Sequence, residues 1–436
     1  MPATATGQEL WDLVASGRPQ GRPAYTRPAS LPGAALELPY PGTDPLAETE
    51  ARVVAAARHL STLTALTAIV DGTLGVRRLE PHDLVGPHAA TASIRGVRVA
   101  RLSVIGADGH TAEYDPARHA LVPARDSFAP VGLRLEADLD RVPEGYAPVR
   151  EVVGLLEAGM HHATAAWLTG LLLPGWVGSA GPAPVPDRPA AADGLPDSDG
   201  SARASRASDQ QATAAGGPVG SARPFQVSAW HAPGIPGTSP QPAAAADWPL
   251  DPERFTRPFG DLLGGLGVLD VLCRRSAGRG PLGLAPSRRP DPRGAEALPG
   301  LLRAVAADIE LTDGQDAPLR LVPVSPAAVA AAFTYPAHRV DAAACDTAFL
   351  LVGRRDRAAG PAAVRGALLA AGACYQRLAL AAGAHGYFLR PVRSIRAPEL
   401  ADAARLRPDE VILLTLLGGR SRYVELSLPS SCLPFR

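Results

Sequence analysis

The sequence predicts a protein of the α+β class in which one supersecondary unit occurs twice. Helical hydrophobic patterns alternate with a few strand patterns, without the regular spacing of βαβ units. Residues 155–173 and 368–386 both begin Leu-Leu-x-Ala-Gly, and both reach another glycine, Gly170 or Gly383, eleven positions after the first. Such self-similarity predicts one unit used in both halves. Between the copies, residues 177–248 are rich in Pro, Ala, Gly, Ser and Asp, which is typical of a linker.

The first half is predicted to contain an extended arm, a mixed domain and the linker. Residues 1–45 are Pro-rich and poorly periodic, which predicts the arm. Residues 46–176 form the predicted domain. It begins with a helical pattern over 46–75, which Asp71-Gly72 breaks near its end. A strand over 97–105, a turn at 107–109, a short strand at 121–122 and the repeated helix over 150–173 follow. Residues 177–248 cannot bury enough apolar surface to offset the entropy of ordering them. We therefore expect a disordered, flexible linker, in which only 225–230 could dock locally.

Order is expected to return in a second domain, residues 249–436. Its periodic segments predict helices over 259–273, 295–308, 361–384 and 398–405, and strands over 319–324, 347–353 and 411–417.

Composition limits the function classes. The chain of 436 residues has room for two domains, and its 43 basic residues, all arginine, balance 43 acidic ones. This balance argues against a protein whose main role is binding nucleic acid. The four cysteines show no short paired spacing, so neither a zinc framework nor a disulfide scaffold is predicted. Glu9 and Asp12 stand where a signal peptide would be basic and then apolar, and no apolar run is long enough to span a membrane, so we expect a cytoplasmic protein.

A cluster of arginines follows the predicted helix at 259–273. Arg274-Arg275-Ser276 and Arg279 lie in a turn that contains Gly278 and Gly280. Guanidinium groups offer a planar fork to phosphate oxygens, serine adds a short hydrogen bond, and glycine lets the backbone approach closely. The turn is thus either a phosphate receptor or a solvated basic turn, and spacing alone does not decide between them.

The surrounding motifs carry a resemblance over about 255–425. These motifs are Val271 to Ser276, Gly372 to Ala382 with Gln376 inside it, Ala384 to Tyr387, Arg390 to Ile395, Pro408 to Ile412, and Gly418 to Arg420. They resemble the flavin-binding nitroreductase fold, and most closely its azoline (thiazoline/oxazoline) dehydrogenase branch of the SagB type. In that family an Arg-Arg-Ser-x-Arg segment holds the FMN phosphate, and here the last arginine is displaced by one residue, to Arg279.

The first half is similar to the same family in a degenerate form. Tyr114 to Leu121 matches the family's Tyr-Asp-Pro-x-x-His-x-Leu, a turn between two strands. Gly86 to Ser93 lies where the family places a flavin-contacting loop, without spelling that loop, and Arg77-Arg78 is only a weak stand-in for the phosphate cluster. The resemblance therefore implies two nitroreductase-like α/β units, the first degenerate, and at most one FMN per chain. Because that fold holds FMN at a dimer interface, an internal pseudo-dimer and an ordinary homodimer are both open.

The resemblance implies an FMN-dependent oxidoreductase that oxidises azoline rings to azoles in a ribosomally made, thiopeptide-like peptide. Its partners would be the precursor peptide and, where one exists, a cyclodehydratase complex. The residues implied to bind the cofactor are Arg274, Arg275, Ser276, Gly278, Arg279, Gln376, Arg420 and Arg422, and the candidate bases are Tyr335, then His385 or Tyr387.

Departures from the family keep two alternatives open. The chain contains no lysine, and residues 354–361 no tyrosine, whereas the family carries a Lys-Tyr pair before its long helix. A nitroreductase-like scaffold that binds a peptide or partner enzyme without catalysis is one alternative, and an NAD(P)H-dependent nitro or quinone reductase is the other. Glu157, His161 and His162 have helical spacing that suggests a metal, but their place in the repeat favours helix-packing histidines.

Overall fold

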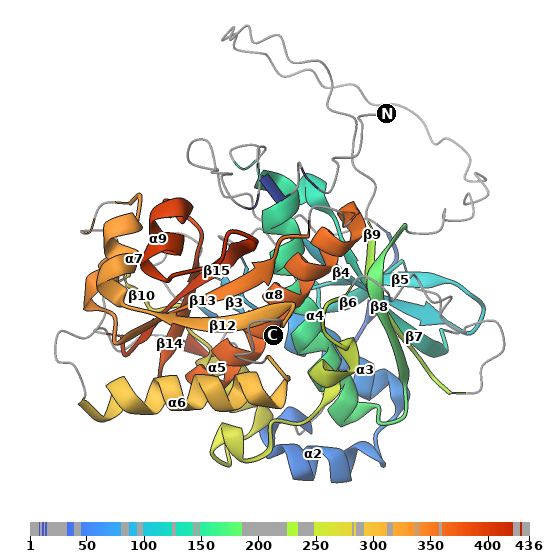
Figure 1. Ribbon diagram of the computed structural model, residues 1–436. Helices are drawn as coiled ribbons and strands as arrows, with labels where there is room; N and C mark the ends of the chain where they lie inside the picture. Colours follow the sequence, from blue (N-terminus) through green and yellow to red (C-terminus); the bar gives the residue numbers. More distant parts are fainter. Residues whose placement is uncertain are drawn as a thin grey trace, which may run out of the picture.

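In the computed structural model, two β-sheets lie on either side of a pair of long central helices (Figure 1). The structure describes residues 8, 11–12, 14, 33–38, 45–79, 87–93, 99–123, 128–142, 146, 149–184, 225–233, 248–280, 283–284, 292–311, 317–335, 337, 340–356, 360–421 and 428–429.

The first unit is a seven-stranded antiparallel sheet packed on a long helix. The sheet has the order β1-β6-β5-β4-β7-β9-β8. Leu102 and Leu135 are register partners that face the buried core, whereas their neighbours Arg101 and Glu136 pair on the opposite face. This alternation is what a sheet with one apolar face requires. The bounds are β1 Leu36–Glu37, α2 Glu50–Ala57, α3 Thr62–Leu74, β4 Ala100–Gly106, β5 Thr111–Asp115, β6 Ala120–Val122, β7 Pro130–Ala137, α4 Arg150–Leu172, β8 Val177–Pro184 and β9 Phe225–His231.

The second unit is a four-stranded antiparallel sheet of order β12-β13-β15-β14 with helices on both faces. Along β13, Leu351 belongs to the core shared with α8, while Leu350 and Val352 belong to a second core under α7 and α9. Both faces of this sheet are thus apolar and covered. The bounds are α5 Val268–Arg274, α6 Pro292–Asp308, β12 Leu319–Val324, α7 Pro326–Ala332, β13 Thr347–Arg354, α8 Pro361–Ala384, β14 Phe388–Val392, α9 Ala397–Ala403 and β15 Glu410–Gly419.

Short elements complete the chain. The strands β2 and β3 form a small sheet with β16, while β10 and β11 form a hairpin. Their bounds, with those of the 3-10 turns, are η1 Pro45–Ala47, β2 Val76–Leu79, β3 Pro87–Ala89, η3 Leu139–Arg141, η6 Pro252–Thr256, η7 Gly260–Leu263, β10 Arg279–Gly280, β11 Gly283–Leu284, η8 Ala342–Ala344 and β16 Leu428–Pro429.

Strand order confirms the predicted repeat. In the first unit β4-β7-β9-β8 are adjacent, and in the second β12-β13-β15-β14 are adjacent, with every neighbouring pair antiparallel. In both units the long helix follows the second strand of this series and precedes the fourth. The two halves are therefore copies of one β–β–α–β–β unit.

The two copies meet at their repeated helices, α4 and α8. A methyl group built at Gly159 would lie well under 3.0 Å from the carbonyl oxygen of Leu369, and one built at Gly372 equally close to that of Leu156. Gly159 and Gly372 are equivalent positions of the repeat, as are Leu156 and Leu369. The contacts are thus reciprocal, as an approximate two-fold axis through the crossing demands. Glycine at both positions is required because the helix backbones touch.

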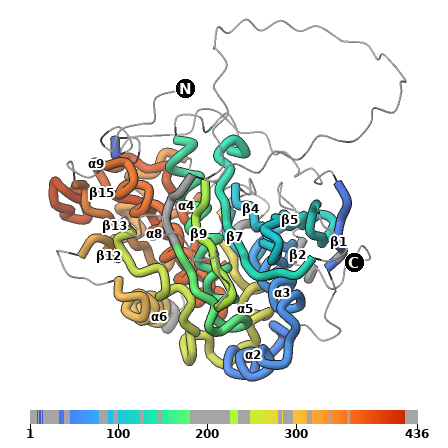
Figure 2. The backbone as a smooth tube through the Cα atoms, turned by 90° about the vertical axis from the view of Figure 1, so that its right-hand side faces the viewer, coloured from blue at the N-terminus to red at the C-terminus, as the bar shows by residue number. Residues whose placement is uncertain are grey.

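The predicted linker is wrong at both of its ends. Residues 177–184 form β8 and residues 225–231 form β9, and Val227, Ser228 and Trp230 are buried. Figure 2 shows β9 running beside β7 next to α4. The first unit therefore continues beyond residue 176, because its last two strands lie inside a segment whose average composition is that of a linker. Residues 185–224 lie outside the described residues.

The predicted arm and two predicted helices also need correction. Trp11 and Val14 of the arm are helical and belong to the buried core. Asp12 pairs with Arg355, and the Val14 carbonyl accepts from Arg393 of the second unit. The predicted helix over 46–75 divides into α2 and α3, and Asp71-Gly72 lies inside α3, where glycine lets Leu168 pack closely. The predicted helix over 259–273 is the turn η7 followed by α5.

Helix α8 is long and apolar enough to cross a membrane by length and composition, but its apolar window is wholly buried in the protein. It packs on α4 and on the second sheet, so the apolar composition serves the core.

Candidate functional site

The predicted phosphate turn, Arg274 to Gly278, begins at the last residue of α5 and lies against the end of α8. Val271 and Leu272 anchor α5 in the core. A Cβ at Gly383 would lie 2.8 Å from the Arg275 Cα, so the last turn of α8 touches the turn's backbone. Gly278 takes the left-handed φ of +66° and donates its amide to Ser276 Oγ at 3.0 Å. The backbone of the turn is therefore fixed by its own unit.

The end of α8 brings Tyr387 to this turn. Gly386, with φ of +77°, ends the helix, and the amides of Gly386 and Tyr387 donate to the carbonyls of Gly383 and Ala382. This is the Schellman pattern of a helix C-terminus. The chain then enters β14, where the Leu389 amide donates to the Ser276 carbonyl at 3.1 Å. The geometry of the helix end thus sets where Tyr387 lies.

Arg275 and Gln376 both reach across to the first unit. Arg275 donates from Nε to the Ala90 carbonyl at 2.7 Å and from Nη2 to the Ala89 carbonyl at 3.0 Å. Gln376 donates to the Ala90 carbonyl at 3.3 Å, and its Oε1 accepts from the Ala92 amide at 3.2 Å. The predicted phosphate turn therefore lies next to the segment that the family resemblance assigned to flavin contact.

These bonds change the roles expected of two residues. Gln376 was predicted to contact the cofactor, but its side chain is fully buried, and its amide nitrogen also donates to Thr164 Oγ1 at 3.0 Å. Both amide hydrogens are thus used within the protein. Arg275 is 4% exposed and spends at least two donors on carbonyls. We therefore interpret both residues as holding the loop. The sequence could not predict these hydrogen-bond partners, because every residue has a backbone carbonyl and no motif marks the ones that accept a bond.

Two exposed arginines remain at this place. Arg274 is exposed at the end of α5, and Arg420 is exposed at the end of β15. The Arg420 guanidinium lies 5.1 Å from the centre of the buried Tyr387 ring, a cation–π arrangement. The Asp346 carboxylate accepts from the Arg420 amide at 3.2 Å. Exposed guanidinium groups are the kind of donor that binds an anion.

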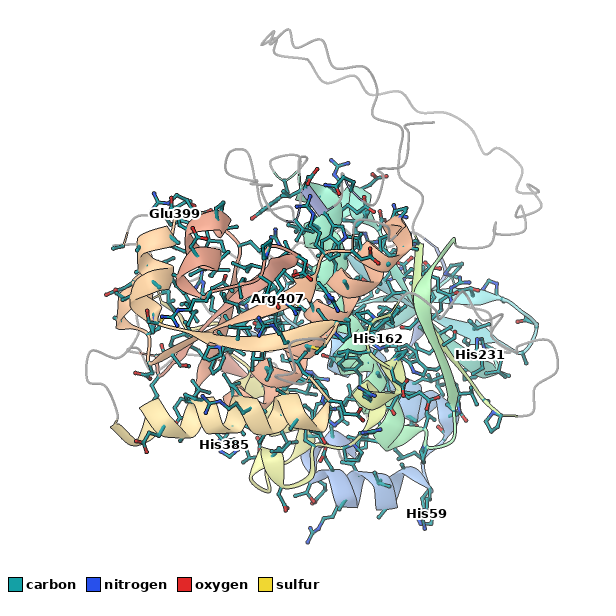
Figure 3. The ribbon with its side chains drawn as sticks, viewed as in Figure 1. His59, His162, His231, His385, Glu399 and Arg407 are labelled. Carbon is teal, nitrogen blue, oxygen red and sulfur yellow. The ribbon has the colours of Figure 1, made fainter. Side chains whose placement is uncertain are left out.

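The other predicted site residues are not all brought to this cluster. Tyr335 lies beside Phe333 in the outer layer with α7 and α9, on the face of the sheet opposite α8, which places it poorly as a base there. His385 is exposed, and its Nε2 lies 2.9 Å from the Leu262 carbonyl (Figure 3). Because a carbonyl only accepts, Nε2 carries the hydrogen. The side chain of Arg279 and the whole of Arg422 lie outside the described residues.

The first unit's counterpart of the arginine turn is neutralised. Arg77 lies just after α3, as Arg275 lies just after α5, but its Nη2 pairs with Asp71 Oδ2 at 2.9 Å. Tyr114 donates to Asp71 Oδ1 at 3.2 Å and lies 3.0 Å from His119 Nδ1. A buried arginine whose charge is balanced by a buried aspartate offers a weak field to an anion.

The histidines of α4 pack in the interior. His161 Nδ1 lies 2.9 Å from the Glu157 carbonyl, and Glu157 itself accepts from Ser93 and from the Val99 amide. His162 packs among Trp230, Trp248 and Phe255, where burial lowers its pKa from 6.5 to about 3 (Figure 3). Within the described residues no group of three His, Cys, Asp or Glu side chains is placed to hold a metal.

No protein-family model matches the sequence, and no curated protein matches it significantly. Among solved structures, one assigned as a nitroreductase from Anabaena variabilis matches with a TM-score of 0.54 and 10% identity, over 92% of this chain and 94% of the other. A protein assigned as a nitroreductase from Exiguobacterium sibiricum, solved in complex with FMN, matches 38% of this chain and 92% of its own, with 15% identity and a TM-score of 0.29. A protein assigned as an NADH dehydrogenase/NAD(P)H nitroreductase from Bacteroides thetaiotaomicron gives 19% identity, 38% and 91% coverage and a TM-score of 0.28. The first match extends over both units, so the chain has the nitroreductase fold over nearly its whole length.

Proposed function

We propose that the protein is an FMN-dependent oxidoreductase with one flavin site, which lies where the second unit's arginine turn meets the first unit's loop. One observation carries this proposal. The two segments that the sequence assigned to phosphate and to flavin contact come from opposite halves of the chain, yet Arg275 joins them directly at 2.7 and 3.0 Å. Solved structures of this fold include one in complex with FMN, which agrees with that choice of cofactor.

The residues present fit the phosphate of FMN. Arg274 offers an exposed guanidinium, and Ser276 follows two residues later in a turn whose backbone is held by bonds from Gly278 and Leu389. Charge-assisted bonds from guanidinium to phosphate are among the stronger polar contacts in proteins. In the first unit the equivalent arginine is paired with Asp71, which supports one FMN per chain.

When bound, FMN would accept a hydride from the substrate, and the protein would supply placement and electrostatics. Arg274 would hold the phosphate, and the loop at Ala89 to Ala92 would border the ring system. Tyr387 lies beside Arg420, and we assign it, acting as its phenolate, to taking the substrate proton. Its ring is mostly buried, which limits the access of water to that proton.

For the substrate we propose an azoline ring in a ribosomally made peptide, which would be oxidised to an azole. The motifs over 255–425 support this choice through their resemblance to azoline dehydrogenases. The precursor peptide, a cyclodehydratase partner, a homodimer or an internal pseudo-dimer, and the cytoplasmic location belong to the same proposal. A scaffold without catalysis is the second candidate, favoured by the use of Arg275 and Gln376 inside the protein and by the missing lysine.

Titration with FMN tests the proposal first. The purified protein should bind FMN in a visible-absorbance titration, and Arg274→Ala should weaken binding by about 10- to 100-fold, as expected for one lost charge-assisted bond of about 1.5–3 kcal/mol. Arg303→Ala, which removes an exposed arginine from α6, is the control and should bind as the unmodified protein does. A protein that takes up no FMN would refute the flavoenzyme and leave the scaffold.

The reaction is then tested by mass spectrometry. A peptide containing an azoline should lose two hydrogens when it is incubated with the FMN-loaded protein. Oxidation of NADH without loss of mass from the peptide would favour the nitro or quinone reductase instead.

A further inference from the structure

The loop at Ala89 to Ala92 is held by side chains of the other unit. Its two consecutive carbonyls, those of Ala89 and Ala90, accept from Arg275, and the Ala90 carbonyl also accepts from Gln376. The Ala92 amide donates to Gln376 Oε1. Three polar backbone groups within four residues are thus satisfied by the second unit, and such groups would be costly if they were buried without partners.

The same face of α8 fixes both sides of the site. Gln376 holds the loop, and Gly383, seven residues later and so on the same helix face, contacts the backbone of the arginine turn. Thr164 of α4 accepts from Gln376 and from the Thr91 hydroxyl at 3.0 Å, which ties the loop to its own unit as well. The loop and the turn are therefore set against each other by the crossing of α4 and α8.

We propose that Arg275 and Gln376 are positioning residues that complete the site by fixing the first unit's loop against the second unit's arginine turn. This inference rests on the FMN site proposed above. It assigns a role to the degenerate first unit, which provides the loop instead of a flavin site of its own. Neither unit alone contains the whole site, because Arg274, which would bind the phosphate, lies on the second unit and the loop lies on the first.

The test compares Arg275→Ala and Gln376→Ala with Arg365→Ala. Arg365 also joins the units, through a 2.6 Å bond from its Nε to Glu151, but this pair lies near the starts of α4 and α8 and does not touch the loop. We expect both loop variants to weaken FMN binding at least tenfold although Arg274 is intact, and Arg275→Lys to recover part of the loss. Arg365→Ala should bind FMN as the unmodified protein does.

A second readout does not depend on FMN. Hydrogen exchange of the Ala92 amide, measured without cofactor, should be at least tenfold faster in both loop variants and unchanged in Arg365→Ala. Normal FMN affinity in Arg275→Ala, or unchanged exchange at Ala92 in Gln376→Ala, would overturn the positioning role. If the unmodified protein binds no FMN, the proposed function fails, while the exchange at Ala92 still decides whether these residues hold the loop.

Discussion

Replacing Gly159 or Gly372 with alanine tests the pseudo-two-fold axis directly. Each glycine of one central helix lies against the backbone of the other, Gly159 at Leu369 and Gly372 at Leu156. If the two units are true copies around one axis, the two substitutions should have nearly the same effect.

The magnitude follows from the contact. A methyl group at either position would lie about 1 Å inside the closest separation that carbon and oxygen tolerate, so the helices must move apart by about that much. The neighbours are backbone atoms of a helix, which cannot turn aside as a flexible side chain does. Overpacking of this kind costs about 1–3 kcal/mol, and we expect each substitution to lower the free energy of unfolding by that amount.

The double variant provides the sharper test. One separation of the helices relieves both clashes, so Gly159→Ala with Gly372→Ala should cost clearly less than the sum of the single variants. Urea unfolding followed by circular dichroism measures all three. The control is Gly300→Ala in α6, where a methyl group meets no atom within 4 Å and helix propensity should raise stability by up to about 1 kcal/mol. Single variants as stable as the unmodified protein, or costs that simply add, would refute the reciprocal contact.

Two further predictions concern single residues. Burial lowers the pKa of His162 to about 3, so below about pH 6.5 the unfolded chain takes up a proton at this residue while the folded chain does not. His162 should therefore lower the free energy of unfolding by about 1.4 kcal/mol for each pH unit, down to a pH of about 3. His162→Phe should remove that part of the slope in urea titrations between about pH 6.5 and pH 5, and an unchanged slope would contradict the assignment. Gly278→Ala should cost about 2–4 kcal/mol, because Gly278 has a φ of +66° and its Cβ would lie 2.5 Å from the Phe388 ring. Gly265→Ala, with a φ of +75° and open space around it, is the control and should cost about 1–2 kcal/mol in unfolding experiments; equal costs would show that the contact with Phe388 yields easily.

The central helices and the inner strands could be predicted from sequence because local signals bound them on both sides. The predicted helix over 361–384 and the predicted strand over 319–324 have the bounds of α8 and β12. Pro361 is favoured at the start of a helix, and Gly386 supplies the positive φ that ends one. Such signals act over a few residues and need no knowledge of the rest of the fold.

Strands β8 and β9 could not be predicted in the same way. Their residues are largely Gly, Ala, Pro and Ser in β8 and lie within a long polar segment in β9. What makes them strands is pairing with β7 and with each other, which are contacts between distant parts of the chain. The repeat held the missing information, since β14 and β15 of the second unit follow α8 as β8 and β9 follow α4. The linker prediction followed the composition of residues 177–248, whereas the repeat would have predicted two strands after α4.

The candidate site was predictable as a set of motifs but not as a set of roles. Arg274, Arg275 and Ser276 share one turn, Leu389 after Tyr387 bonds to the Ser276 carbonyl, and Tyr335 lies elsewhere, beside Phe333. Nothing in the sequence distinguishes Arg274 from Arg275, because two adjacent arginines have the same donors. The two residues differ in burial, and this difference separates their roles. Arg274 is exposed, whereas Arg275 is buried at the boundary of the two units.

This difference gives the two units separate roles in the proposed site. That site needs the arginine turn from the second unit and the loop from the first. The first unit provides a loop whose binding groups are backbone carbonyls and an amide, so these bonds do not require a particular side chain. The loop side chains are constrained by packing instead, because Ala90, Thr91 and Ala92 are buried and Thr91 also bonds to Thr164. The second unit contributes the side chains of Arg275 and Gln376, and these bonds do depend on side-chain identity, because alanine at either position has no group that could reach the loop.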